Sequence, residues 1–218
     1  MIQKTLPSIA PHFSQSYLSL LGSSFYQLKR FALLRQNTLL ITVLFGVFCS
    51  FWTTLTFKLS LAPFSFSSDI IGLFGVLAVA GAMLAPYIGK LADTINPSIT
   101  KALSVGMIIL SVFLMRWFDS SLAAFIVATL LLDIGFQVVQ INNLAQIYTL
   151  DEKAHSRINT AYMSSMFVGG AFGTFIGVLC WEKGGWEMTT LQLLLLSITS
   201  LAVIFYAMLS HPSSTDVH

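Results

Sequence analysis

The sequence contains few charged residues for a chain of its length. Of 218 residues, 11 are lysine or arginine and 9 are aspartate or glutamate, a charged share of 9%, whereas soluble proteins average about 25%. So few charges cannot cover the surface of a soluble fold of this size. Hydrophobic residues make up 56% of the chain, and its mean hydropathy is +0.81. The composition therefore predicts a protein that buries most of its outer surface in a lipid bilayer.

Residues that indicate metal binding, disulfide bonds or catalysis are also scarce. The two cysteines, Cys49 and Cys180, lie in apolar segments and form no disulfide or metal-ligand pattern. The net charge of +2 is too small to predict a nucleic-acid partner. No Gly-x-Ser-x-Gly, His-Glu-x-x-His or phosphate-loop motif occurs. We therefore expect no enzyme activity, no metal and no cofactor.

Six apolar segments long enough to cross a membrane follow one another along the chain. A transmembrane helix needs about 20 apolar residues, and unbroken segments of this length favour helices over the alternating strands of a membrane barrel. The predicted fold class is an all-α membrane protein, with a cytoplasmic linker at 1–37, a six-helix domain at 38–209 and a tail at 210–218. No cleavable signal is expected. The predicted spans are approximately Thr38–Phe57, Ile70–Gly89, Ala102–Phe118, Ser121–Tyr148, Ile158–Trp181 and Met188–Leu209.

The basic residues indicate the orientation of this domain. Eight lysines and arginines fall on the side that holds both termini, and three (Lys58, Arg116 and Lys183) fall on the opposite side. By the positive-inside rule, both termini are expected in the cytoplasm. Trp117, Trp181 and Trp186 are expected at the opposite surface, in an interfacial aromatic belt.

The segment before the first span shows a helical period. Between Tyr17 and Arg35, apolar residues recur on one face, and Lys29 and Arg30 lie beside them. This pattern predicts an amphipathic helix on the membrane surface. An ordinary soluble linker is the alternative.

One acidic residue, Asp133, lies well inside an apolar span. A carboxylate that faces lipid at that depth costs at least about 2.5 kcal/mol, so we expect it to face the bundle or a hydrated cavity. Gln137 and Gln140 share its helix face, and Asn143 lies at the edge of that face. Two interpretations remain open: these side chains line a path for protons or solute, or they form hydrogen bonds between helices, worth about 0.6–2 kcal/mol each.

Small residues at a four-residue spacing predict close packing between helices. Gly169, Gly173 and Gly177 share one face of the fifth span, and Gly81 begins a similar pattern in the second. Small side chains let two helix backbones approach closely, which matters where lipid cancels the hydrophobic driving force. In the first span, Trp52 precedes two threonines; these side chains either line an outward vestibule or bond to carbonyls of their own helix.

The loop after the second span resembles a signature of the major facilitator superfamily. Gly89–Asp93 is similar to the start of that family's Gly-x-Leu-Ala-Asp-x-x-Gly motif, although Asn96 replaces the last glycine. Phe51–Leu55, Asp133–Gln137 and Arg157–Met163 also resemble the C-terminal six-helix half of bacterial inner-membrane efflux-type members. The resemblance covers nearly the whole chain.

This resemblance implies half of a twelve-helix, proton-driven transporter in the bacterial inner membrane. It implies a cytoplasmic gate that includes Gly89 and Asp93, with Arg157 as a partner. The implied partners are the lipid bilayer, protons, a small organic solute, and either a missing N-terminal six-helix half or a second copy of the chain. The alternative hypothesis is a non-transporting membrane scaffold or a truncated remnant.

Overall fold

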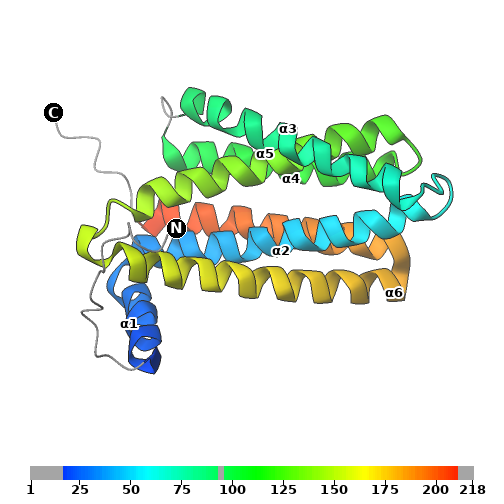
Figure 1. Cartoon of the computed structure of the whole chain (residues 1–218). Helices are drawn as coiled ribbons and strands as arrows, with labels where there is room; N and C mark the ends of the chain where they lie inside the picture. The colour runs from blue at the N-terminus through cyan, green and yellow to red at the C-terminus, as the bar shows by residue number, and fades with distance from the viewer. Residues whose placement is uncertain (1–16, 93–95, 211–218) are drawn as a thin grey trace, which may run out of the picture.

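The chain is built from α-helices that form one elongated bundle (Figure 1). The computed structural model describes residues 17–92 and 96–210, and within these ranges it contains no β-strand. The predicted helical class is therefore confirmed. The helices are α1 (Tyr17–Arg30), α2 (Ala32–Ser60), α3 (Ser68–Ala92), α4 (Pro97–Trp117), α5 (Leu122–Ile147), the short 3-10 helix η2 (Glu152–Ala154) and α6 (His155–Ser210).

Helix α6 consists of two arms that run in opposite directions. Gly184 and Gly185 depart from helical backbone angles, and the φ of Gly185 is 58°, in the left-handed region that glycine adopts at little cost. Figure 1 shows α6 running along the bundle before this break and returning after it. We call residues 155–183 the first arm and residues 186–210 the second arm.

Within the part of the chain that the structure describes, four stretches are long and apolar enough to cross a membrane. They are α2, α4, α5 and the stretch Glu152–Ser210, which contains both arms of α6. The second predicted span lies on α3, where Ser68–Val79 forms a shorter apolar helix by the same measure. A helical membrane protein is thus confirmed, and the count of six spans stays a prediction.

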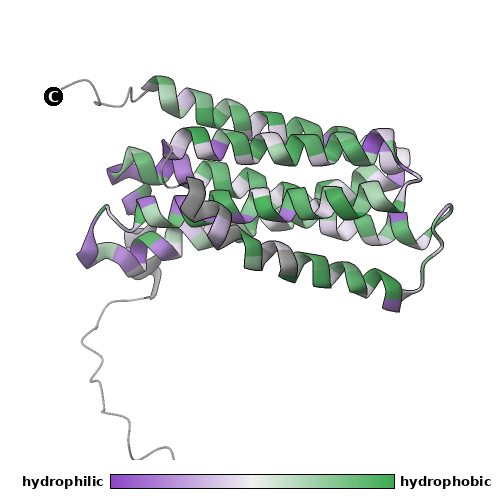
Figure 2. Ribbon diagram, turned by 90° about the horizontal axis from the view of Figure 1, so that it is seen from above, coloured by the Kyte–Doolittle hydropathy of each residue, from purple (hydrophilic) through white to green (hydrophobic). Residues whose placement is uncertain are grey.

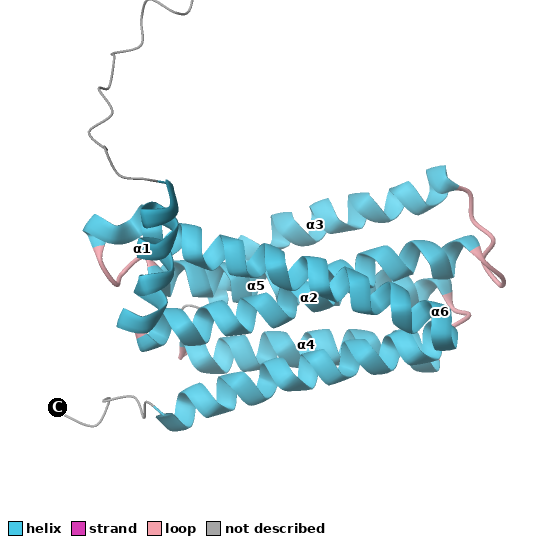
Figure 3. Cartoon of the chain, turned by 90° about the horizontal axis from the view of Figure 1, so that it is seen from below, coloured by secondary structure: helices cyan, strands magenta, loops and turns pink. Residues whose placement is uncertain are grey.

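The polar residues gather at the two ends of the bundle, where the loops also lie (Figures 2 and 3). Asn96 caps α4, since its side chain accepts a hydrogen bond from the Ser98 backbone N–H at 2.9 Å, and Pro97 occupies the first turn. Ser121 caps α5 in the same manner. Both caps satisfy backbone N–H groups at the starts of apolar helices.

The predicted amphipathic helix over Tyr17–Arg35 is divided in the structure. Phe31 has extended backbone angles, so α1 ends at Arg30 and α2 begins at Ala32. Helix α1 lies across the end of the bundle (Figure 1), where the Arg30 guanidinium contacts the Asp151 carboxylate at 2.8 Å. This ion pair joins α1 to the loop that precedes α6. Contact of α1 with the membrane surface stays a prediction.

The closest helix contact is between α2 and the first arm of α6. Gly169 lies against the backbone carbonyl of Thr42, Gly173 against Gly46, and Gly177 against the Ser50 side chain. A Cβ atom at any of these three α6 positions would collide with α2. The spacing of the glycines therefore corresponds to one continuous line of close contact with α2.

Candidate functional site

Asp133 is buried inside the bundle, near the middle of α5. It is 2% exposed, and its Oδ1 atom accepts a hydrogen bond from the Trp52 indole N–H of α2 at 3.3 Å. Its other carboxylate oxygen, Oδ2, is buried with no hydrogen-bond partner among the described residues. A buried acceptor without a partner costs about 1–3 kcal/mol, and more when it carries charge. A proton at Oδ2 would remove the cost of the charge, and a ligand that donates to Oδ2 would supply the missing hydrogen bond.

Helix α3 approaches Asp133 closely from another side. A Cβ atom built on Gly81 would lie 3.0 Å from the Cβ atom of Asp133, tighter than ordinary contact. Gly81 therefore lets α3 pack directly on the acidic residue. Trp52, Gly81 and Asp133 bring three helices, α2, α3 and α5, to one point in the bundle.

The other polar residues of α5 do not join Asp133 in one cluster. Gln137 and Gln140 are half-buried. Asn143 is fully buried, and its Nδ2 atom donates to the Asn37 carbonyl of α2 at 3.2 Å. Ten residues separate Asp133 from Asn143, which corresponds to roughly 15 Å along a helix. Asn143 thus belongs to a second polar group nearer the α1 end.

The threonines beside Trp52 bond to their own helix. The Thr53 hydroxyl donates to the Cys49 carbonyl at 2.9 Å, and the Thr54 hydroxyl donates to the Ser50 carbonyl at 2.7 Å. These bonds satisfy the hydroxyl donors without help from a solute. Of this segment, only the Trp52 indole N–H is directed at the acidic residue by a hydrogen bond that the structure describes.

The second polar group surrounds Lys101 of α4. The Lys101 ammonium donates to Asn37 Oδ1 at 2.8 Å and to Gln146 Oε1 at 2.6 Å, and the residue is 5% exposed. The Asn37 amide also donates to Gln146 Oε1, at 3.0 Å. The predicted span begins one residue later, at Ala102, so the sequence did not predict this group. One signal was available: Asn37, Lys101 and Gln146 all lie at or near the ends of predicted spans, on the side expected to hold both termini.

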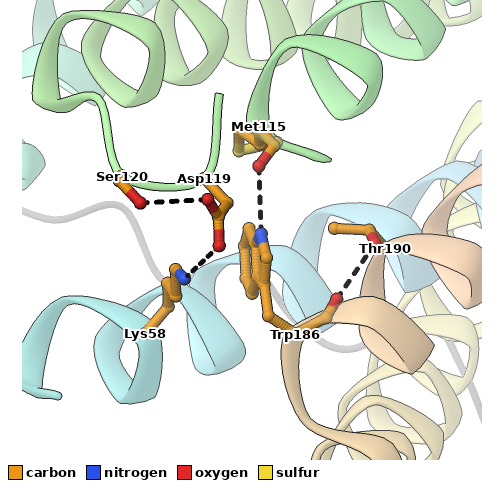
Figure 4. A network of polar contacts seen from close by, with 6 residues as sticks. All are labelled: Lys58, Met115, Asp119, Ser120, Trp186 and Thr190. Atoms are coloured by element: carbon orange, nitrogen blue, oxygen red, sulfur yellow. Dashed lines mark hydrogen bonds and ion pairs between the residues drawn. The ribbon is translucent and has the colours of Figure 1, made fainter. Parts of the chain in front are cut away.

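The opposite end of the bundle is closed by a third group of contacts (Figure 4). The Lys58 ammonium contacts the Asp119 carboxylate at 3.1 Å, and the Ser120 hydroxyl donates to the same carboxylate at 3.0 Å. The hydrogen bond from Lys58, and then the one from Ser120, lower the pKa of Asp119 below its ordinary value. This group joins the end of α2 to the turn between α4 and α5.

Trp186 completes the contacts at that end. Its indole N–H donates to the Met115 carbonyl at 3.1 Å, and its own carbonyl accepts from the Thr190 hydroxyl at 2.9 Å (Figure 4). Trp117 is 68% exposed, whereas Trp186 lies at the expected end of the bundle but is 8% exposed and buried in it. It packs inward because the break at Gly185 directs the second arm of α6 back over the ends of α4 and α5.

The predicted gate residues are only partly described. Arg157 lies in the first arm of α6 with an exposed side chain, and it takes part in neither of the two ion pairs found in the described ranges. Gly89 lies in α3, in a part whose surroundings are not described, and Asp93 lies outside the described residues. The gate therefore stays a prediction.

Comparisons with known proteins find relatives that are named as transporters. No protein-family model and no solved structure matches the chain. Over 199 residues the chain is 35% identical to uncharacterized transporter YgaY of Escherichia coli O157:H7, a match that covers 91% of this chain and 50% of that protein. YgaY of Escherichia coli K12 matches to the same extent. A Streptomyces coelicolor protein that is also named as a transporter, SCO4007, is 25% identical over 144 residues, or 66% of this chain and 33% of that protein. The chain thus spans about half the length of the YgaY relatives it matches.

Proposed function

We propose that this chain is one half of a transporter that moves a small organic solute across a bacterial inner membrane. The relatives named as transporters support a transport role, and the match to half of their length supports a half-transporter. The resemblance to the major facilitator superfamily supports alternating access driven by protons. The single observation that carries the proposal is the buried Asp133 carboxylate, with one oxygen held by Trp52 and the other without a partner.

The proposed membrane topology has six crossings, formed by α2, α3, α4, α5 and the two arms of α6. An even number of crossings agrees with the arrangement in Figure 1, where α1 and the last turns of α6 lie at the same end of the bundle. The excess of lysine and arginine on that side favours a cytoplasmic location for it. The gate of Gly89, Asp93 and Arg157 would then lie at the cytoplasmic end.

In this mechanism Asp133 alternates between a protonated and an ionised state. The protonated acid is neutral and tolerates the apolar bundle, whereas the ionised carboxylate requires water or a cationic group beside Oδ2. Trp52 holds Oδ1, so the proton and the solute compete for the other oxygen. Competition for one oxygen is the simplest way to couple proton entry to solute exit. Gln137 and Gln140 would supply hydrogen bonds along the path.

A second six-helix unit is part of the proposal. Transporters of this kind bind solute near the membrane midplane, between two repeats that rock against each other. Gln137 and Gln140 are only half-buried in the chain by itself, so a facing unit would enclose them. That unit is the remaining half of the transporter or a second copy of this chain.

Thiol labelling at Gln137 tests whether the polar face is hydrated. In a background with Cys49→Ala and Cys180→Ala, we expect the thiol of Gln137→Cys to react with a membrane-impermeant, charged methanethiosulfonate reagent. Leu132→Cys, at a position that is 0% exposed in the bundle, is the unreactive control. Equal protection of both thiols would favour the scaffold hypothesis, in which the polar residues only hold helices together.

A further inference from the structure

A cavity of about 370 Å³ lies at the α1 end of the bundle, away from Asp133. It is bounded by the beginnings of α2 and α4 and by the ends of α5 and of the second arm of α6. Its volume falls within the range of about 300–1,000 Å³ that small-molecule sites occupy. Its polar lining is formed by Gln36, Asn37, Ser98, Lys101 and Gln146.

Lys101 places an ammonium group at this cavity. The residue is 5% exposed, and the two hydrogen bonds that the structure describes for its ammonium go to the amide oxygens of Asn37 and Gln146. Neither ion pair of the described residues includes it. Amide oxygens satisfy the donors of an ammonium, but they do not neutralise its charge. A buried cation without a counter-charge costs several kcal/mol, so this position favours an anion.

The start of α4 adds to the positive potential at the cavity. Ser98, in the first turn of α4, lines the cavity. The first N–H groups of α4 bond to Asn96, so this helix end acts through its dipole, whose positive end attracts anions. The Lys101 ammonium and this helix end therefore act on the same space.

We propose that this cavity binds a small oxyanion, a carboxylate or a phosphate, with the Lys101 ammonium as its charged ligand. The site is separate from the Asp133 path, and the inference does not depend on transport, because binding can be measured at equilibrium. The same chemistry is offered by a soluble anion and by the phosphate of a lipid headgroup. Nanodiscs with and without an anionic lipid distinguish these two sources.

The binding test uses the full chain in nanodiscs of zwitterionic phosphatidylcholine. The probes are inorganic phosphate and acetate, each compared with chloride at the same ionic strength, and the readout is the thermal unfolding midpoint. We expect a saturable rise with phosphate or acetate. Lys101→Gln should weaken the apparent affinity at least about tenfold, whereas Lys153→Gln, at an exposed position outside the cavity, should leave it unchanged.

A second variant tests the site while Lys101 remains present. Gln146→Glu keeps the side-chain shape and places a carboxylate where Gln146 Oε1 now lies, 2.6 Å from the Lys101 ammonium. This internal anion should raise the unfolding midpoint in chloride and abolish the shift caused by phosphate or acetate. The result is informative even if Lys101→Gln fails to fold.

Nanodiscs that contain anionic phosphatidylglycerol identify the source of the anion. A stabilisation by this lipid that Gln146→Glu removes assigns the site to a headgroup phosphate. A shift by soluble anions alone assigns it to a soluble ligand. The proposal is overturned if no saturable shift occurs with any of these probes, or if Gln146→Glu responds to them as the unsubstituted chain does.

Discussion

Gly173 of α6 and Gly46 of α2 lie backbone against backbone, so close that a Cβ atom on Gly173 would overlap the Gly46 carbonyl group. Gly169 makes the equivalent approach to the Thr42 carbonyl one turn before, and Gly177 lies against the Ser50 side chain one turn after. Contacts of this kind supply dispersion energy where lipid offers no hydrophobic driving force between helices. The α2–α6 interface is thus the part of the bundle that is least tolerant of added volume.

Gly173→Ala is expected to destabilise the protein by about 1–3 kcal/mol, because the added methyl group meets backbone atoms that cannot rotate away. The change in the free energy of unfolding is measured in mixed detergent micelles, with tryptophan fluorescence as the signal for unfolding. Gly106→Ala is the matched control, since a Cβ atom at Gly106 of α4 meets nothing within 4 Å. Alanine favours helix by up to about 1 kcal/mol over glycine, so the control should be neutral or stabilising. Equal effects at both positions would contradict the close contact.

Trp186→Phe is expected to lower stability by about 1–3 kcal/mol. The substitution keeps an aromatic ring in the core but removes the indole N–H, which leaves the Met115 carbonyl without this donor. Trp117→Phe provides the comparison, because Trp117 is 68% exposed and should change stability by less than about 0.5 kcal/mol. The measurement is the thermal unfolding midpoint of each variant. An equal decrease of the midpoint in both variants would contradict the buried hydrogen bond of Trp186.

The ion pair between Lys58 and Asp119 should make stability depend on acid pH. Because the hydrogen bond from Lys58 lowers the pKa of Asp119 in the folded state, the pair stabilises fully above the unfolded value of about 4. This contribution is lost as pH falls through the lowered folded pKa. Asp119 is 53% exposed in its side chain, so solvent screening limits the contribution to about 0.2–1 kcal/mol.

The measurement is the unfolding midpoint of the unsubstituted chain and of Asp119→Asn between pH 7 and pH 3. The unsubstituted chain should be the more stable of the two at neutral pH, and the two should converge at the acid end. Asp69→Asn, at an exposed position outside both ion pairs of the described residues, controls for the general effect of removing a carboxylate. A difference that grows as the pH falls would have the wrong sign.

The sequence was sufficient to predict the helical membrane class, because long apolar segments have few stable alternatives in lipid. It was less informative where a single residue interrupts a pattern. The period over Tyr17–Arg35 continues through Phe31, yet the backbone at Phe31 is extended and the helix divides there. The periodicity of apolar residues does not indicate such a break. The break depends on how α1 packs against the end of the bundle.

The polar contacts were harder to predict than the helices. Asp133 stood out because it is an acid inside an apolar segment, but its contact with Trp52 joins residues 81 positions apart. Lys101 and Gln146 lie at helix ends, where exposed polar residues are ordinary, and only the packing of α2, α4 and α5 reveals that Lys101 is buried against a half-buried Gln146. The burial of Trp186 was not predicted for the same reason. Burial at the end of a bundle depends on which helices cover it.

The most direct test of the account is the flux of an organic cation through proteoliposomes that contain the chain together with its second six-helix unit. Ethidium is a suitable probe, because its fluorescence reports its movement and an ionised Asp133 would attract it. Under an imposed proton gradient, we predict that Asp133→Asn slows transport at least about tenfold, or about 1.4 kcal/mol in the barrier, and removes its pH dependence, while Asp69→Asn retains both. An unchanged rate and an unchanged pH dependence in Asp133→Asn would contradict the central role of this carboxylate.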